Sequence, residues 1–130
     1  PSRLVLKGLT WREIAMLYRN SDLIVDGFSG WFGYAALEGL SCGKPVLNYL
    51  EPRAMNRMYP AGHLFLQARN TREVADILLL HQDPAIRERV GGYSRKWILE
   101  HHLYSATTAK CRKMLSELTA DIIDPPVTSC

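Results

Sequence analysis

The sequence predicts an α/β fold with a parallel sheet, and three features support this prediction. Short apolar runs at residues 22–26 and 45–49 have the composition of buried parallel strands. Between them lies a run rich in Ala, Leu and Glu that ends at Gly43, as a helix would. A further strand and helix precede the first run, so strands and helices alternate from residue 3 to residue 49. Such alternation predicts parallel strands joined by right-handed crossovers.

The elements before residue 22 follow from a turn and a capping pattern. Residues 3–7 are an apolar run typical of a strand, and Gly8 opens the turn after it. Thr10 and Glu13 have the spacing of a capping box, in which each side chain accepts a hydrogen bond from the other residue's backbone N–H. Apolar residues at helical spacing follow, and they predict a helix over residues 11–19.

A loop, a strand and three helices are expected after the strand at 45–49. Residues 50–62 contain two prolines and no clear period, which predicts a long surface loop. Residues 62–66 predict a short strand, and a second capping box at Asn70 and Glu73 predicts a helix to about residue 81. Pro84 opens the next helix, which ends at about residue 101 and has an apolar face formed by Ile86, Val90, Tyr93, Trp97 and Ile98. The last predicted helix starts at Ser105, and its apolar stripe consists of Cys111, Met114, Leu115 and Leu118.

The composition argues against several classes of protein. The 130 residues, 47% apolar and 22% charged, are typical of one soluble globular domain. The 16 basic and 13 acidic residues give a net charge of +3 and are scattered, so we expect no nucleic-acid partner. No apolar run approaches the length of a membrane span. Because the chain begins without Met, we expect it to be a piece of a longer protein.

The cysteine and histidine residues predict a reduced compartment and no metal site. Cys42, Cys111 and Cys130 are widely spaced, without a Cys-x-x-Cys pair, and no signal peptide is recognisable. A cytoplasmic location is therefore expected. Cys42 is expected to be a small buried residue at the end of a helix. His101 and His102 are adjacent on a helix and point in different directions, so joint metal binding is not expected.

The predicted ligand edge lies where the second strand ends. Parallel strands place the turn after each strand at the carboxyl edge of the sheet, where open α/β folds bind ligands. Gly30 and Gly33 precede the helix, and the backbone N–H groups of Gly33 and Tyr34 would attract an anion, most often a phosphate. Asp26 ends the strand, and two roles are open for it: an acceptor that caps the helix, or a contact to a hydroxyl or ammonium group. Leu9, in the turn after the neighbouring strand, would form the floor under a flat base.

Glu38 is the main candidate for ligand binding by a side chain. It is the only charged residue of an otherwise apolar helix, and a buried carboxylate is rarely kept without a partner. Its two acceptor oxygens suit the two neighbouring hydroxyls of a ribose. The alternative is a solvated Glu on a helix surface. No nucleophile with a base, no P-loop lysine and no pair of carboxylates is recognisable, so no catalytic residue is predicted within this chain.

One segment resembles a known family. Residues 37–46, Leu-Glu-Gly-Leu-Ser-Cys-Gly-Lys-Pro-Val, resemble the Glu-Ala-Met-Ala-x-Gly-x-Pro-Val signature in the carboxyl-terminal domain of retaining glycosyltransferases of the GT-B type, the glycogen synthase and sucrose synthase-like group. The resemblance implies a Rossmann-like three-layer α/β/α domain with a parallel sheet of about four strands. Residues 3–120 would form part of that nucleotide-sugar-binding domain, and residues 121–130 a flexible tail.

The resemblance also implies a function and a division of roles. Glu38 would hold the ribose of a UDP-, GDP- or ADP-sugar donor, the amides of Gly33 and Tyr34 its diphosphate, and the turn at Leu9 its base. Gly30 stands where the family usually has another Glu, and Asp26 is a candidate substitute. The whole enzyme would transfer a hexose to an acceptor in polysaccharide or glycolipid synthesis, without a further cofactor or metal.

The resemblance implies partners as well. The acceptor site would come from an amino-terminal GT-B domain that this chain lacks, so the fragment would be inactive alone, and the full-length enzyme could associate peripherally with a membrane. Two alternatives remain open. One is an enzyme like the sugar-nucleotide 2-epimerases, which share the architecture, and the other is an α/β module that binds a ligand without catalysis.

Overall fold

Three short parallel strands form the sheet in the computed structural model, which describes residues 7–123. The strands β1 (Ile24–Val25), β2 (Val46–Asn48) and β3 (Leu66–Gln67) lie side by side in that order. Ile24 is opposite Val46, and Leu47 is opposite Leu66. The α/β class and the parallel sheet are therefore confirmed.

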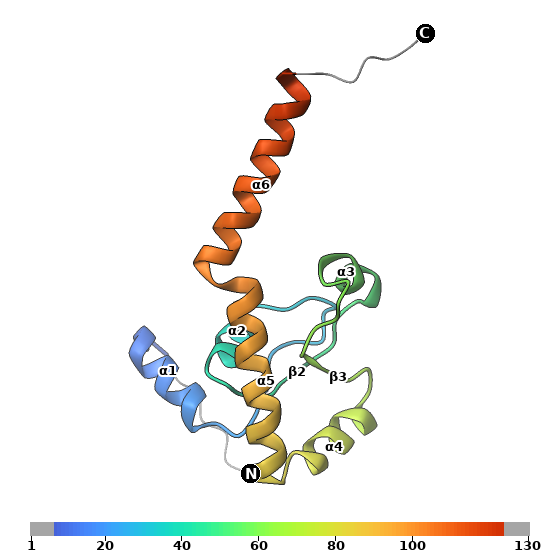
Figure 1. Cartoon of the computed structure of the whole chain (residues 1–130). Helices are drawn as coiled ribbons and strands as arrows, with labels where there is room; N and C mark the ends of the chain where they lie inside the picture. Colours follow the sequence, from blue (N-terminus) through green and yellow to red (C-terminus); the bar gives the residue numbers. More distant parts are fainter. Residues whose placement is uncertain (1–6, 124–130) are drawn as a thin grey trace. The chain divides into compact units, whose positions relative to one another are not determined.

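Six α-helices accompany this sheet in the described part of the chain (Figure 1). Five of them were predicted, and their observed bounds agree with the prediction to within about two residues at most ends. At the start of the first helix, Thr10 Oγ1 accepts the N–H of Glu13 at 3.4 Å, and Glu13 accepts the N–H of Thr10 at 2.8 Å, which confirms the capping box. The helices are α1 (Trp11–Asn20), α2 (Tyr34–Ser41), α3 (Pro52–Met58), α4 (Thr71–Leu80), α5 (Pro84–His102) and α6 (Tyr104–Ile123).

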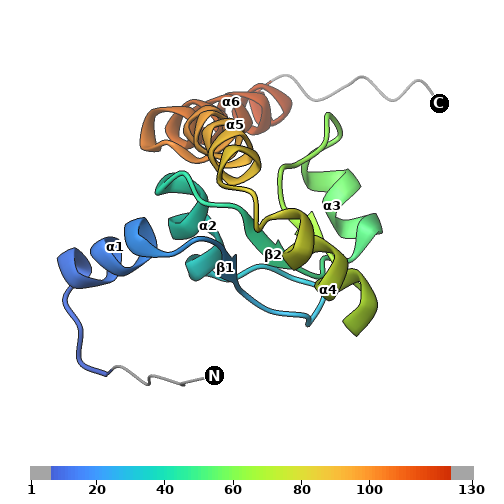
Figure 2. The same ribbon diagram turned by 90° about the horizontal axis from the view of Figure 1, so that it is seen from below.

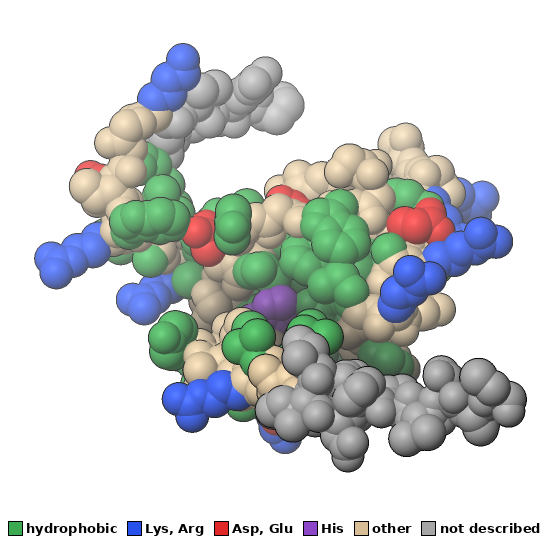
Figure 3. Space-filling model, turned by 90° about the horizontal axis from the view of Figure 1, so that it is seen from above, with side chains coloured by type: hydrophobic (Ala, Val, Ile, Leu, Met, Phe, Trp, Pro, Cys, Tyr) green, Lys and Arg blue, Asp and Glu red, His purple; other side chains and the backbone are tan. Residues whose placement is uncertain are grey.

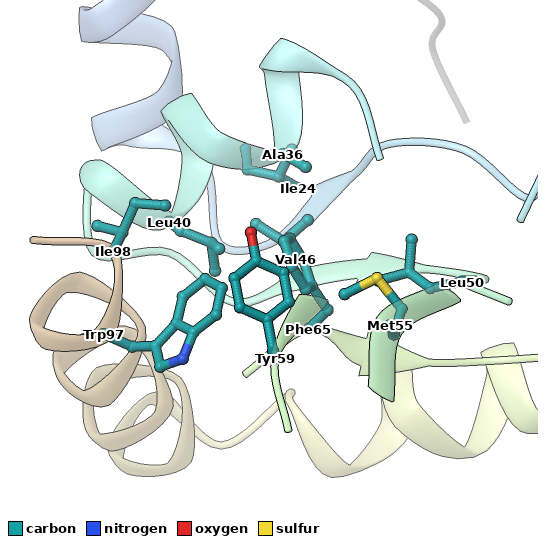
Figure 4. Packing of buried hydrophobic residues seen from close by; sticks show 10 residues of the cluster. All are labelled: Ile24, Ala36, Leu40, Val46, Leu50, Met55, Tyr59, Phe65, Trp97 and Ile98. Carbon is teal, nitrogen blue, oxygen red and sulfur yellow. The ribbon is translucent and has the colours of Figure 1, made fainter. Parts of the chain in front are cut away.

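The hydrophobic core forms where α2 packs on β1 and β2, with α1 beside α2 (Figure 2). Leu40 and Val46 are completely buried at its centre. From other elements, Trp97 and Tyr59 meet edge to face, with ring centroids 4.9 Å apart (Figure 4). The buried cluster consists of Ile24, Ala36, Leu40, Val46, Leu50, Met55, Tyr59, Phe65, Trp97 and Ile98.

The loop prediction for residues 50–62 is wrong, because this segment contains α3. Pro52 stands at the first helical position, where its missing N–H costs nothing. Met55 and Tyr59 are four residues apart, so they lie on one side of the segment, and both are buried in the core. Burial of these two side chains, with the proline at the start, favours a helix over an irregular loop.

The apolar face predicted for α5 is partly wrong. Tyr93 is exposed, whereas Gly91 and Ser94 are buried together with Trp97 and Ile98. The reason is a close approach of two backbone segments: a Cβ atom added at Gly91 would lie 1.9 Å from the carbonyl oxygen of Gly43. The small residues Gly91 and Ser94 therefore occupy part of the buried face, beside the expected Trp97 and Ile98.

Other predictions are corrected or lie beyond the described residues. The third strand begins at Leu66 instead of residue 62, because Leu66 is the first residue of that segment paired with β2. Residues 3–6 of the first predicted strand lie outside the described residues, so the fourth strand and the three-layer arrangement stay predictions. The last helix continues to Ile123, and the rest of the predicted tail, residues 124–130, also lies outside.

The chain divides after Ile98 into two compact units. All candidate ligand-binding residues belong to the first unit. The second unit contains α6, on which Met114, Leu115 and Leu118 of the predicted stripe are exposed among the described residues.

Candidate functional site

The amino-terminal end of α2 opens beside a hollow. Gly33 precedes the helix in an extended conformation and, as a glycine, supplies no side-chain cap. The hollow has a volume of about 300 Å³ and is lined by Trp31, Phe32, Gly33, Tyr34 and Leu37. Trp31 is 48% exposed and its ring stacks on Phe32 at a centroid distance of 5.3 Å, which fixes one wall. The first turn of α2 and an aromatic wall thus border the same space.

Asp26 holds the residue that precedes this helix. Its Oδ2 accepts a hydrogen bond from the N–H of Gly33 at 2.8 Å. Of the two roles considered for Asp26, the structure shows the acceptor at the helix start. The prediction that the Gly33 N–H is open to a phosphate is wrong for this structure, because Asp26 already occupies that donor. No side chain of the described residues accepts the N–H of Tyr34, so this donor of the predicted pair is the one left at the helix start.

Glu38 is paired with a residue that the sequence did not single out. Its Oε2 accepts a hydrogen bond from the hydroxyl of Tyr18 at 3.0 Å, and the contact joins α1 to α2. Glu38 is half-buried, so neither the fully buried nor the fully solvated alternative is correct. Among residues 7–123, no donor contacts its second carboxylate oxygen.

The environment of Tyr18 shows that this contact is partly shielded from water. Burial, followed by the hydrogen bond and the charge of Glu38, raises the pKa of Tyr18 to about 12. The charge of Asp26 contributes in the same direction, so Tyr18, Glu38 and Asp26 are close enough to interact electrostatically. Tyr18 therefore stays protonated at neutral pH and donates its hydrogen bond to Glu38.

Gly30 has a structural role at the position where the resembled family usually carries Glu. Its φ is +91°, a region that side chains disfavour, and it pairs with Leu50 in a parallel bridge. Its carbonyl oxygen accepts the N–H of Glu51 at 2.8 Å. A Glu at position 30 would therefore be strained, which gives a physical reason for glycine here.

Leu9 is not brought together with the other candidates. It is half-buried and lines a separate hollow of about 230 Å³ with Glu13, Met16, Leu17 and Asn20. All of these residues belong to α1 or the turn before it. The structure thus groups Asp26, Gly33, Tyr34 and Glu38 at one edge, and a floor formed by Leu9 stays a prediction.

The described residues offer few candidates for other kinds of site. No group of three or more His, Cys, Asp or Glu side chains there is arranged to hold a metal ion. No described helix is both long enough and apolar enough to cross a membrane.

Cys42 is half-buried at the end of α2, and Cys111 is exposed; both are free thiols. On the face drawn in Figure 3, several Lys and Arg side chains lie close together at the right-hand edge, beside acidic side chains.

Comparisons of this chain with models of protein families, with curated proteins and with solved structures found no match. The assignment of a function therefore depends on the geometry of the site and on the resemblance of residues 37–46.

Proposed function

We propose that this chain is the nucleotide-sugar-binding part of a GT-B type glycosyltransferase with a Rossmann-like fold, which transfers a hexose from a nucleotide-diphosphate donor. The observation that carries the proposal is the arrangement at the start of α2. An open helix end borders a hollow of about 300 Å³ at the carboxyl edge of a parallel sheet. The half-buried carboxylate of Glu38 lies one turn further along the same helix, beside the residues that line the hollow and not among them.

Each part of the donor has a proposed contact. The N–H of Tyr34 and the positive end of the helix dipole attract the diphosphate. The Glu38 oxygen that Tyr18 leaves unused accepts a ribose hydroxyl, and the Tyr18 bond fixes the orientation of the carboxylate. During transfer, the same helix end stabilises the negative charge that develops on the departing diphosphate. The acceptor and its binding groups would come from an amino-terminal domain.

The Asp26–Gly33 hydrogen bond favours a second candidate function, an α/β module that binds a ligand without catalysis. A carboxylate beside the helix end repels a diphosphate, and it removes one N–H donor from the predicted phosphate site. Such a module would accept a neutral ligand with hydroxyl groups, which Asp26 and Glu38 could both contact.

Isothermal titration of UDP, GDP and ADP against the full chain tests the proposal. We expect one of these nucleotides to bind, and Glu38→Ala to weaken its binding about tenfold, the effect of losing a charged hydrogen bond. Glu88→Ala is the matched control, because Glu88 is exposed and lines a hollow beside residues that precede β1 and β2, at the other edge of the sheet. Equal affinities for the unmodified chain and Glu38→Ala would reject the ribose contact.

A further inference from the structure

Two adjoining hollows at the carboxyl ends of β2 and β3 form a second groove, separate from the hollow at α2. One has a volume of about 310 Å³ and is lined by Phe28, Tyr49, Ala68 and Arg69. The other has a volume of about 270 Å³ and is lined by Phe28, Arg69, Asn70, Thr71 and Val74. They share the lining residues Phe28 and Arg69, and we call the two hollows together the edge groove. None of its residues lines the hollow at α2.

The aromatic wall of the edge groove is held in place by backbone hydrogen bonds. The N–H of Tyr49 donates to the carbonyl oxygen of Gly27 at 3.0 Å, which fixes the loop carrying Phe28 beside the end of β2. The bridge between Gly30 and Leu50 fixes the same loop a second time. Phe28 nevertheless remains 49% exposed. The exposure of this ring is therefore a property of a fixed loop, and the ring is available to a ligand.

The floor of the edge groove is small and rigid. Ala68 is completely buried, and its N–H donates to the carbonyl oxygen of Asn48 at 3.0 Å, so it continues the pairing of β2 with β3. This hydrogen bond holds the backbone at the floor of the groove in place.

The cation of the edge groove is Arg69, whose backbone is fixed while its side chain is exposed. The N–H of Arg69 donates to Glu73 Oε2 at 2.8 Å, and Asn70 Nδ2 donates to Glu73 Oε1 at 2.9 Å. Both oxygens of Glu73 are therefore engaged by the start of α4. Within the described residues, the guanidinium of Arg69 forms no ion pair. Its charge is free to pair with an anion from solution.

We propose that the edge groove binds a small ring compound that carries a phosphate or carboxylate group. The ring packs against Phe28 and Tyr49, and the anionic group forms a two-pronged contact with the guanidinium of Arg69. A neutral ring lacks the ion pair, and a bare phosphate lacks the ring contact, so both bind more weakly. The ring can be a sugar or an aromatic ring, since the apolar face of either can lie against an aromatic side chain.

Saturation-transfer NMR on the full chain tests this proposal with two anionic probes, glucose 6-phosphate and phenyl phosphate, and two neutral ones, glucose and phenol. We expect transfer to at least one anionic probe and much weaker transfer to its neutral counterpart. Arg69→Gln should weaken binding of that probe about tenfold. Phe28→Ala should reduce transfer to the ring protons. Which anionic probe binds more tightly identifies the type of ring.

Arg72→Gln is the matched control, because Arg72 is also exposed at the start of α4 but does not line the edge groove. It should leave transfer unchanged. Equal transfer to glucose and glucose 6-phosphate, full binding by Arg69→Gln, or an equal loss in Arg72→Gln would overturn the proposal. Nucleotide binding at Glu38 is measured separately, so failure of one site does not decide the other.

Discussion

Glycine has a different role at each end of α2: it permits close packing at one end and leaves space at the other. At the carboxyl-terminal end, a Cβ atom at Gly39 would lie 3.0 Å from side-chain atoms of both Ile24 and Val46, and Gly91 of α5 packs on the backbone at Gly43. At the amino-terminal end, Gly33 lies beside the carboxylate of Asp26 and a solvent-accessible hollow. One glycine-rich segment therefore contains a packed end that fixes the helix and an open end that borders a hollow.

The largest effect is expected at the contact between α5 and Gly43. Gly91→Ala should lower the free energy of unfolding by about 3 kcal/mol, because backbone atoms that cannot turn aside must separate. Denaturation in urea gives this value. Gly92→Ala is the control, since its added Cβ would meet no atom within 4 Å. A Gly91→Ala protein as stable as Gly92→Ala would show that this end of α2 is not closely packed.

A smaller loss is expected at Gly39. The crowding of Ile24 and Val46 costs about 2 kcal/mol. Replacing glycine inside a helix returns about 1 kcal/mol. Gly39→Ala should therefore lower the stability by about 1 kcal/mol net, again measured in urea. An increase in stability would mean that the contact of α2 with the sheet is loose.

At the open end of α2, the charge of Asp26 is expected to affect ligand binding. Asp26→Asn keeps an acceptor near the Gly33 N–H and removes a negative charge from the helix start. If a diphosphate binds there, its affinity should increase about threefold at low salt. Titration calorimetry measures this change. A decrease would instead indicate that the Asp26 carboxylate contacts a hydroxyl or a cation of the ligand.

The last effect is expected for Tyr18, and it appears only at alkaline pH. Its pKa is raised to about 12 in the folded protein, above the ordinary value of 10.0, so folding favours the protonated form. The resulting contribution to stability is complete below pH 10, and it is lost as the pH rises through about 12. Tyr18→Phe should flatten the decrease in stability over this range. The same slope in both proteins would show that Tyr18 titrates as an ordinary tyrosine.

Local signals predicted most of the fold correctly. The errors have two causes: a local signal that was not used, and contacts between segments that are distant in the sequence. Caps such as Thr10 with Glu13 act within one turn, so the sequence displays them directly. The helix at Pro52 was missed although its proline and the spacing of Met55 and Tyr59 are visible signals. The exposure of Tyr93 depends on how closely α5 approaches Gly43, which no local pattern contains.

The candidate site was predictable in its location but not in its internal contacts. The pattern of strand, glycines and helix identified the carboxyl edge and the residues Asp26 and Glu38. The Tyr18 partner of Glu38 comes from another helix, so no pattern within residues 34–41 could reveal it. The residues of the edge groove follow three different strands, so only the sheet brings Phe28 and Arg69 together.

The start of α2 and Glu38 are proposed to bind a nucleotide diphosphate. The most direct test is an NMR titration of the ¹⁵N-labelled chain with UDP, GDP and ADP, in which backbone amide shifts are followed residue by residue. We expect the largest shifts at Tyr34 and the residues up to Glu38. In Glu38→Ala the same shifts should require about tenfold more nucleotide, whereas in Glu88→Ala the titration should be unchanged. Shifts confined to Phe28 and Arg69, or no shifts at the start of α2 with any of the three nucleotides, would contradict this proposal.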